Sequence, residues 1–513
     1  MSAGSKRLRW APPWVQALVA GAVSALALPP LDLLPALLAY GWLVLLLLDA
    51  PGWRSAWWRA VAFVFAQAAV GLHWIAIAFT VDVERFGPLA VPAVFLLCVG
   101  IALIQGSVVS LLRLRSWHSP LAAALAFAPL WLLGEWLRGV IGQFPWNLVG
   151  YAFADWLWLA QGAALGSVWW LGWLALLVGT LPVALRLPRR QGLGWCGLVL
   201  AGLAGLAWWG HDRLREPTAF TETRLRLVQA AFALDHGFDH IRMQTWFFDQ
   251  VRWSLEPLDA PVDAIIWSEG ASPYRLDTDE VARDVIASLL RERGARWLLT
   301  GGDRLAFAAD GRLLGVNNSL FAIDPDGAVG ARYDKVDLVP FGEFLPLRPV
   351  LERFGLDKVT AGSIDYVRGP GRRTLDLEGL PPFSPLICYE TIFAGRVHAA
   401  VRPDWLLNVT IDTWFGDSLG PHQHLAMART RAIEEGLPLI RVANSGISAS
   451  IDAHGRILER MDLDVVGVRD VALPAPVEKT FFARNRWLLL AISIALGVVL
   501  AVIIEFTSGR QRS

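Results

Sequence analysis

Charged residues are scarce in this chain. Lysine, arginine, aspartate and glutamate make up 18% of its 513 residues, whereas hydrophobic residues make up 55%. A soluble protein of this length carries more charge, so the composition favours a membrane protein. Basic and acidic residues balance to a net charge of zero. No basic surface for nucleic acid is therefore predicted.

Cysteine is also rare. The three cysteines, Cys98, Cys196 and Cys388, are too few for a disulfide framework. The first two fall in apolar segments, where packing is their expected role. Cys388 is therefore the only cysteine in the polar region between residues 211 and 486.

Lysine is as scarce as cysteine, although arginine is abundant. It occurs at four positions only: Lys6, Lys335, Lys358 and Lys479. A lysine that falls inside a motif is for that reason informative.

What the chain does have is long apolar runs, eight of which are long enough to span or nearly span a bilayer. The first two are short and separated by Pro29-Pro30, so one broken hairpin is an alternative. No signal-peptide cleavage pattern precedes them, and the first run is expected to remain as an anchor. The 26 tryptophans suit the headgroup region. The runs cover residues 14–28, 32–49, 57–80, 88–112, 119–137, 161–185, 193–210 and 487–505.

Basic residues gather in alternate loops, beginning with Lys6, Arg7 and Arg9. Basic loops stay in the cytoplasm, although Arg484 and Arg486 oppose the trend. We therefore expect a multi-pass protein of the bacterial inner membrane whose polar region faces the periplasm. The expected parts are an N-terminal transmembrane bundle (1–210), a linker (211–223), a periplasmic domain (224–480) and a C-terminal transmembrane helix (487–505).

A few polar residues interrupt the apolar runs, among them Gln67, Gln105 and Glu135. Glu135 and Arg138 are three residues apart and are expected to pair. Such groups face the bundle interior, and helix packing or a substrate contact would each explain them. The stretch Phe-Pro-Trp-Asn at 144–147 is typical of an interfacial or re-entrant element.

The polar region alternates short β-rich runs with helical stretches, which predicts a layered α/β domain. Asp-Pro-Asp-Gly at 324–327 predicts a hairpin between the runs 319–323 and 330–333. The predicted helices cover 238–254, 279–293 and 422–435. The predicted strands cover 226–230, 264–268, 297–300, 319–323, 386–388, 405–409, 439–442 and 447–452.

Three of these runs end in residues with catalytic chemistry. Glu269 ends the run Ile-Ile-Trp-Ser-Glu, Lys335 follows Tyr-Asp, and Cys388 ends Leu-Ile-Cys before Tyr389 and Glu390. Strand ends are where α/β folds place chemistry, because the loops there converge. A carboxylate accepts a thiol proton, and an ammonium stabilises a thiolate or an oxyanion.

Each residue also has a plainer interpretation. Free cysteines are often buried core residues, a glutamate after a strand often caps a helix, and lysines are usually solvated. His422 and His424 together suggest a metal, but no third ligand is in register, so structural hydrogen bonds are expected. No phosphate loop is present either, so no metal or cofactor is predicted.

Short motifs around the three strand ends resemble those of a known family. The order Glu, Lys, Cys is similar to that of the nitrilase superfamily. Together with the flanking membrane runs, the motifs resemble the apolipoprotein N-acyltransferase family over nearly the whole chain. The motifs are Phe-Pro-Trp at 144–146, Trp-Ser-Glu at 267–269, Lys335 with Leu-Val-Pro-Phe-Gly-Glu at 338–343, Arg-Gly-Pro at 368–370, Cys-Tyr-Glu at 388–390, Trp-Phe-Gly-Asp at 414–417 and Gly-Pro-His-Gln-His at 420–424.

The resemblance implies a membrane bundle of about eight helices joined to a four-layer α-β-β-α sandwich. It implies acyl transfer through a thioester on Cys388, with Glu269 as general base and Lys335 at the oxyanion. Glu343, Tyr389 and Glu390 would support the site. The donor would be a phospholipid, typically phosphatidylethanolamine. The acceptor would be the S-diacylglyceryl-cysteine of an apolipoprotein.

Apolar residues between 341 and 372 suit a mobile lid that dips into lipid. Phe238, Phe341, Phe344 and Trp414 are candidate substrate-loop residues. The chain departs from the family pattern near Ala231, Phe238 and Ile411, which affects the expected acceptor or lipid preference. A membrane-tethered amidase or hydrolase with water as acceptor is the alternative enzyme, and a transporter or sensor is the non-enzymatic one.

Overall fold

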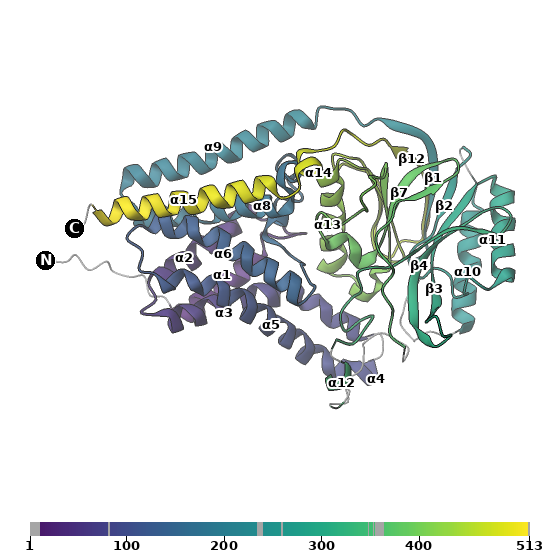
Figure 1. Cartoon of the computed structure of the whole chain (residues 1–513), viewed down its shortest axis with the longest axis horizontal. Coiled ribbons are helices and arrows are strands. Elements are labelled where there is room, and N and C mark those ends of the chain that lie inside the picture. Colours follow the sequence, from purple (N-terminus) through teal and green to yellow (C-terminus); the bar gives the residue numbers. More distant parts are fainter. Residues whose placement is uncertain are drawn as a thin grey trace.

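Two parts of the chain lie side by side in the structure, a helical bundle and a domain built on two β-sheets (Figure 1). The structure is a computed structural model that describes residues 11–80, 83–232, 240–257, 260–346, 348–351, 353 and 364–510. Helix α9 leads from the bundle to the first strand, and α15 returns from the sheets along the bundle, as Figure 1 shows.

Long apolar helices make up the bundle. Within the described residues, six are long and apolar enough to cross a membrane. The first two expected spans form shorter helices, and the 13 residues of α1 extend only about 20 Å against a hydrocarbon core of about 30 Å. The main helices are α1 (Pro13–Ala25), α2 (Leu38–Leu48), α3 (Trp53–Leu72), α5 (Ala90–Ser110), α6 (Pro120–Ile141), α8 (Ala163–Gly179), α9 (Arg189–Arg213) and α15 (Leu488–Arg510).

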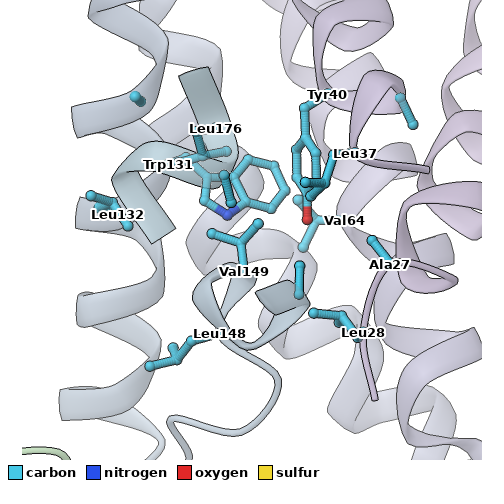
Figure 2. Close-up of a cluster of buried hydrophobic side chains, with 14 of the residues drawn as sticks. Ala27, Leu28, Leu37, Tyr40, Val64, Trp131, Leu132, Leu148, Val149 and Leu176 are labelled. Carbon is cyan, nitrogen blue, oxygen red and sulfur yellow. The ribbon is translucent and has the colours of Figure 1, made fainter. Parts of the chain in front are cut away.

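The bundle has an apolar interior and an apolar outer surface. Tyr40 and Trp131 meet edge to face in its core, with ring centroids 4.8 Å apart, and Val64 and Val149 lie beside them (Figure 2). Large apolar side chains such as Leu96, Leu198 and Ile503 are exposed on the outer surface. Helices that are apolar all round are typical of a membrane span, because lipid covers their outer face.

The polar residues inside the bundle support its own backbone. Arg138 Nη2 lies 3.9 Å from Glu135 Oε1, so the expected pair is confirmed. Arg138 donates to the Trp146 carbonyl at 2.8 Å, and Glu135 accepts from the Val149 amide at 2.9 Å. These bonds hold the stretch 144–149 against α6, which favours packing over a direct substrate contact.

Among the residues that the structure describes, each sheet of the second part contains six strands. One sheet has the order β12-β1-β2-β3-β4-β5 and the other has the order β11-β10-β9-β8-β7-β6. The predicted hairpin is confirmed, because β4 and β5 pair antiparallel. Every predicted strand is present, whereas β6, β11 and β12 were not anticipated. The strands are β1 (Phe220–Gln229), β2 (Ala264–Ile266), β3 (Trp297–Phe307), β4 (Leu313–Ile323), β5 (Val329–Asp334), β6 (Leu375–Leu377), β7 (Leu380–Ile387), β8 (Trp405–Thr410), β9 (Leu439–Ala443), β10 (Ser448–Ile451), β11 (Ile457–Met461) and β12 (Gly467–Pro474).

The two sheets pack face to face and each carries helices on its outer side. Alternate residues such as Leu227 and Leu407 fill the space between the sheets. Helices α10 (His240–Ser254) and α11 (Glu280–Arg293) cover the first sheet, and α13 (Leu419–Glu435) covers the second. The expected α-β-β-α sandwich is thereby confirmed. Because α13 also packs against α8, it lies between the second sheet and the bundle (Figure 1).

Candidate active site

Cys388 lies directly after β7, as the first residue of the short helix η8 (Cys388–Ile392). Its backbone is left-handed, with a φ of 49°, a conformation that is uncommon and strained for residues other than glycine. The residue is only 8% exposed. The sharp turn therefore places Cys388 at the carboxyl end of β7, in the second sheet.

The acid and the lysine come from the ends of strands in the first sheet. Glu269 follows β2 and Lys335 follows β5, and Lys335 Nζ lies 3.2 Å from Glu269 Oε1. The same ammonium lies 2.8 Å from Glu343 Oε1. The structure thus brings together Glu269, Lys335 and Glu343 from separate parts of the sequence.

Two close approaches of backbone are needed to build this cluster. A Cβ on Gly301 would lie 2.6 Å from the Glu269 Cα, and a Cβ on Gly369 would lie 2.1 Å from the Asp334 carbonyl oxygen. The Gly369 amide donates to the Lys335 carbonyl at 2.7 Å. Because both positions are glycine, the backbone of β3 packs directly against Glu269, and the loop at 369 packs directly against the backbone just before Lys335.

Burial and charge set the protonation of the cluster. Burial raises the pKa of Glu269, the nearby Lys335 opposes this shift, and Glu343 adds to it. Burial alone would lower the pKa of Lys335, but the carboxylates of Glu269 and Glu343 hold it well above its ordinary value. The lysine is therefore an ammonium at neutral pH, paired with two carboxylates.

The Cys388 thiol lies in the field of the same groups. Burial raises its pKa, the charge of Glu269 raises it further, and the charge of Lys335 lowers it. The resting residue is therefore a thiol that needs a base. Glu269 is the carboxylate whose charge acts most strongly on it.

Glu390 lies between the backbone segments that carry Cys388 and Lys335. Its carboxylate is fully buried and accepts from the amides of Ile387 and Val336 at 2.8 and 2.7 Å. It also accepts from the Tyr333 hydroxyl at 2.9 Å and pairs with Arg372 at 3.0 Å. It therefore joins the backbone before Cys388 to the backbone after Lys335. We call this set of bonds the Glu390 brace.

Tyr389 points to the bundle. Its hydroxyl donates to the Gln143 carbonyl, and its ring stacks near Phe144 with centroids 6.5 Å apart. Arg368 donates to the Gln143 side chain at 2.7 Å. Residues 143–144 of the bundle thus touch the residue that follows the candidate nucleophile.

The candidate substrate-loop residues are scattered around the site. Phe341 is 53% exposed and has a left-handed backbone with a φ of 63°. Phe344 is half-buried, with the Arg368 guanidinium 5.7 Å from its ring centre. Trp414 is half-buried in the short helix η9 (Asp412–Phe415). Phe238 and residues 354–363 of the expected lid lie outside the described residues.

Sequence reasoning missed two groups that hold Glu269. Asn318 on β4 donates to Glu269 Oε1 at 2.7 Å, and the Ile411 amide donates to Oε2 at 2.9 Å. Two asparagines in a row inside a buried strand were an available signal for the first. The second has no sequence signal, because a backbone amide makes the bond whatever side chain stands at 411.

A small cavity of about 40 Å³ opens beside the acid. Glu269, Phe232, Trp246, Ile411 and Asn444 are among the residues that line it. Within the described part of the chain, no group of three or more histidine, cysteine, aspartate or glutamate side chains is placed to hold a metal ion.

The second part of the chain is a carbon-nitrogen hydrolase domain. The family model described as carbon-nitrogen hydrolase matches residues 266–479, and the one described as apolipoprotein N-acyltransferase N-terminal domain matches residues 20–181. An amidase of the nitrilase superfamily from Nesterenkonia is 16% identical, with a TM-score of 0.37, over 54% of this chain and 98% of its own.

Curated relatives match along almost the whole length. An apolipoprotein N-acyltransferase from Rhodopseudomonas palustris is 38% identical over 95% of this chain and 94% of its own. Those from Bradyrhizobium diazoefficiens and Caulobacter vibrioides are 37% and 35% identical, over 95% and 90% of this chain and 95% and 89% of their own. The chain belongs to the apolipoprotein N-acyltransferase family.

Proposed function

We propose that this membrane-bound acyltransferase moves an acyl chain from a phospholipid to the α-amine of an S-diacylglyceryl-cysteine at the start of an apolipoprotein. Family membership carries the acyl-transfer activity on lipoproteins. The phosphatidylethanolamine donor and the inner-membrane site with a periplasmic catalytic domain are parts of the proposal. The observation that carries the mechanism is the buried cluster of Glu269, Lys335 and Glu343 beside the Cys388 thiol.

In the first half-reaction, Glu269 takes the proton of the Cys388 thiol and the thiolate attacks an ester carbonyl of the phospholipid. The resulting oxyanion is stabilised by the Lys335 ammonium and by backbone amides that follow the nucleophile. Collapse of the tetrahedral intermediate breaks the carbon–oxygen bond. The departing lysophospholipid oxygen takes the proton from Glu269, and a thioester remains.

In the second half-reaction, the α-amine of the acceptor attacks the thioester carbonyl. Glu269 accepts the proton that the amine loses, and Lys335 again stabilises the oxyanion. The carbon–sulfur bond then breaks, the amide is released, and Glu269 returns the proton to the thiolate. The cycle needs no external oxidant, reductant or nucleotide.

The remaining residues have supporting roles in this proposal. Glu343 holds the ammonium in place at 2.8 Å, Glu390 fixes the two backbones beside the site, and Tyr389 joins the site to the re-entrant stretch. Phe341, Phe344, Trp414 and Phe238 are proposed to contact acyl chains. The contact between Tyr389 and Gln143 supports entry of both lipid substrates from the side of the bundle.

Mass spectrometry of the purified protein after incubation with phosphatidylethanolamine tests the mechanism. We expect an acyl mass on the Cys388 peptide that hydroxylamine removes and that is absent in Cys388→Ala. Adding a diacylglyceryl-cysteine peptide should discharge it to an amide. Release of free fatty acid at the same rate with and without the peptide would instead identify a hydrolase, and an unmodified thiol under all conditions would refute the thioester.

A further inference from the structure

A buried histidine lies behind the candidate nucleophile. His424 Nε2, on α13, is 3.1 Å from the Cys388 carbonyl oxygen, and the Thr391 hydroxyl donates to the same oxygen at 3.1 Å. The His424 side chain is fully buried. None of the roles assigned above uses this residue, although it contacts the backbone of the cysteine directly.

The partners of the ring decide where its proton lies. A carbonyl oxygen only accepts, so the contact with Cys388 requires the proton on Nε2. The Asp412 carboxylate also only accepts, so its contact with Nδ1 at 3.0 Å requires a proton on that nitrogen as well. Burial and the charge of Arg441 lower the pKa of His424, whereas Asp412 and the bond to the Cys388 carbonyl raise it. Arg441 Nη2, which lies 3.1 Å from Nδ1, donates to the other oxygen of Asp412.

Charged and aromatic groups hold the ring from every side. Asp412 Oδ1 lies 3.0 Å from Nδ1, and Asp412 pairs with Arg441 at 2.5 Å, with all three side chains buried. The rings of Trp146 and Phe415 lie 5.5 and 6.0 Å from the imidazole by their centroids. A ring packed in this way has no freedom to swing away from the carbonyl.

The same aspartate is held by the strand next to β7. The Thr410 hydroxyl, at the end of β8, donates to Asp412 Oδ1 at 2.9 Å, and the charge of Asp412 raises the pKa of the Cys388 thiol. His424 and Thr391 therefore contact the Cys388 carbonyl, and Asp412 and Thr410 support the histidine from behind.

We propose that His424, oriented by Asp412, is a positioning residue for Cys388. It holds the carbonyl of a residue whose left-handed backbone, with a φ of 49°, is strained, and so keeps the thiol turned toward Glu269 and Lys335. This role rests on the proposed function, because it has meaning only if Cys388 is the nucleophile.

The residue before His424 links the same turn of α13 to the bundle. The Gln423 side-chain oxygen accepts from the indoles of Trp146 and Trp74 at 2.8 and 3.1 Å, and its amide donates to the Gly71 carbonyl at 3.2 Å. Two consecutive residues of α13 therefore make different contacts: Gln423 bonds to the bundle, and His424 contacts the backbone of Cys388.

The test compares His424→Ala, His424→Gln and Thr391→Val with His422→Ala as the matched control, all in the full-length protein in detergent. Single-turnover acylation of Cys388 by phosphatidylethanolamine is measured against lipid concentration and pH, together with the melting temperature. We expect His424→Ala to slow acylation about tenfold or more with an unchanged half-saturating lipid concentration. His424→Gln, which keeps a donor near the Nε2 position, should recover most of the rate. Thr391→Val should slow acylation severalfold.

The outcomes separate the two proposals. Absence of acylation in the unmodified protein overturns the proposed function. Normal acylation there, with an unchanged rate in His424→Ala, overturns only the positioning role. That role also fails if His424→Gln is as slow as His424→Ala, if the loss in rate is confined to one limb of the pH profile, or if His422→Ala loses as much activity.

Discussion

The side-chain amide of Asn318 donates to Glu269 Oε1 over 2.7 Å, although the two residues lie 49 positions apart in the sequence. Their strands, β4 and β2, belong to one sheet with β3 between them. The bond favours the ionised carboxylate and lowers the pKa of Glu269 against the larger effect of burial. Asn318 therefore helps to keep the base ready to accept a proton.

Replacing Asn318 by leucine should weaken the base. The pKa of Glu269 would rise further once the amide is lost, so a larger fraction of the acid would be protonated at a given pH. We expect the acidic limb of the acylation profile to move to higher pH and the rate at neutral pH to fall about tenfold. A pH-independent loss of rate would show that Asn318 acts only on folding.

Glu343→Gln should move the basic limb of the pH profile of acylation. The charges of Glu269 and Glu343 hold the pKa of Lys335 well above its ordinary value, and the ammonium form stabilises the oxyanion. Removing one carboxylate lowers that pKa, so activity should be lost at a lower pH as the pH is raised. Stopped-flow acylation followed from neutral pH to above 10.5, the ordinary pKa of a lysine, measures the shift, and an unmoved basic limb would contradict the role of Glu343.

Glu390→Gln should damage folding more than chemistry. Within the described part of the chain, the partners of this carboxylate are all donors, among them the Ile387 amide and the Tyr333 hydroxyl, so an amide nitrogen in its place would face another donor. We expect a loss of about 3 kcal/mol or more in the free energy of unfolding. Tyr333→Phe, which removes one bond, should cost about 1 kcal/mol. Equal denaturation midpoints for the two variants would contradict the brace.

The strain at Cys388 is measurable without activity. Its φ of 49° disfavours alanine and suits glycine, so Cys388→Gly should be more stable than Cys388→Ala by about 1 kcal/mol. At an ordinary strand or helix position the order would be reversed. Calorimetry of the two variants in the same detergent decides the sign.

Phe341 should affect the lipid and not the thiol. It is 53% exposed and begins a turn in which its own amide donates to the Phe344 carbonyl at 2.8 Å. We expect Phe341→Ser to raise the half-saturating concentration of long-chain phospholipid severalfold, by loss of buried apolar area, and to leave iodoacetamide labelling of Cys388 unchanged. Phe307, 57% exposed on β3, provides the control. An equal effect of Phe307→Ser would remove the special role of Phe341.

Much of the architecture follows from local patterns. A short apolar run predicted β8, all six of whose residues are buried, because its sheet is covered on both faces. Longer apolar runs predicted the helices α5 and α15, because apolar residues must also be buried in lipid. β6, β11 and β12 were missed. β6 has three residues, too short for a periodic signal, and β11 and β12 are only partly buried, so they lack a clear apolar pattern.

The sequence also predicted some features of the candidate site and missed others. Glu269, Lys335 and Cys388 were visible in the sequence because each ends a recognisable strand and each is chemically distinctive. The distances among the acids and the lysine, the brace formed by Glu390 and the amide of Ile411 were not visible. They depend on which strand ends meet, and that depends on how the two sheets stack.

The sequence by itself determined the kind of protein this is, since the balance of apolar runs and strand patterns sets what must be buried in lipid and what between sheets. Only the tertiary structure decided that Gln423 forms hydrogen bonds with the bundle while His424 contacts the Cys388 carbonyl. Hydrogen bonds act over about 3 Å between residues hundreds of positions apart, and no local pattern records which of them will meet.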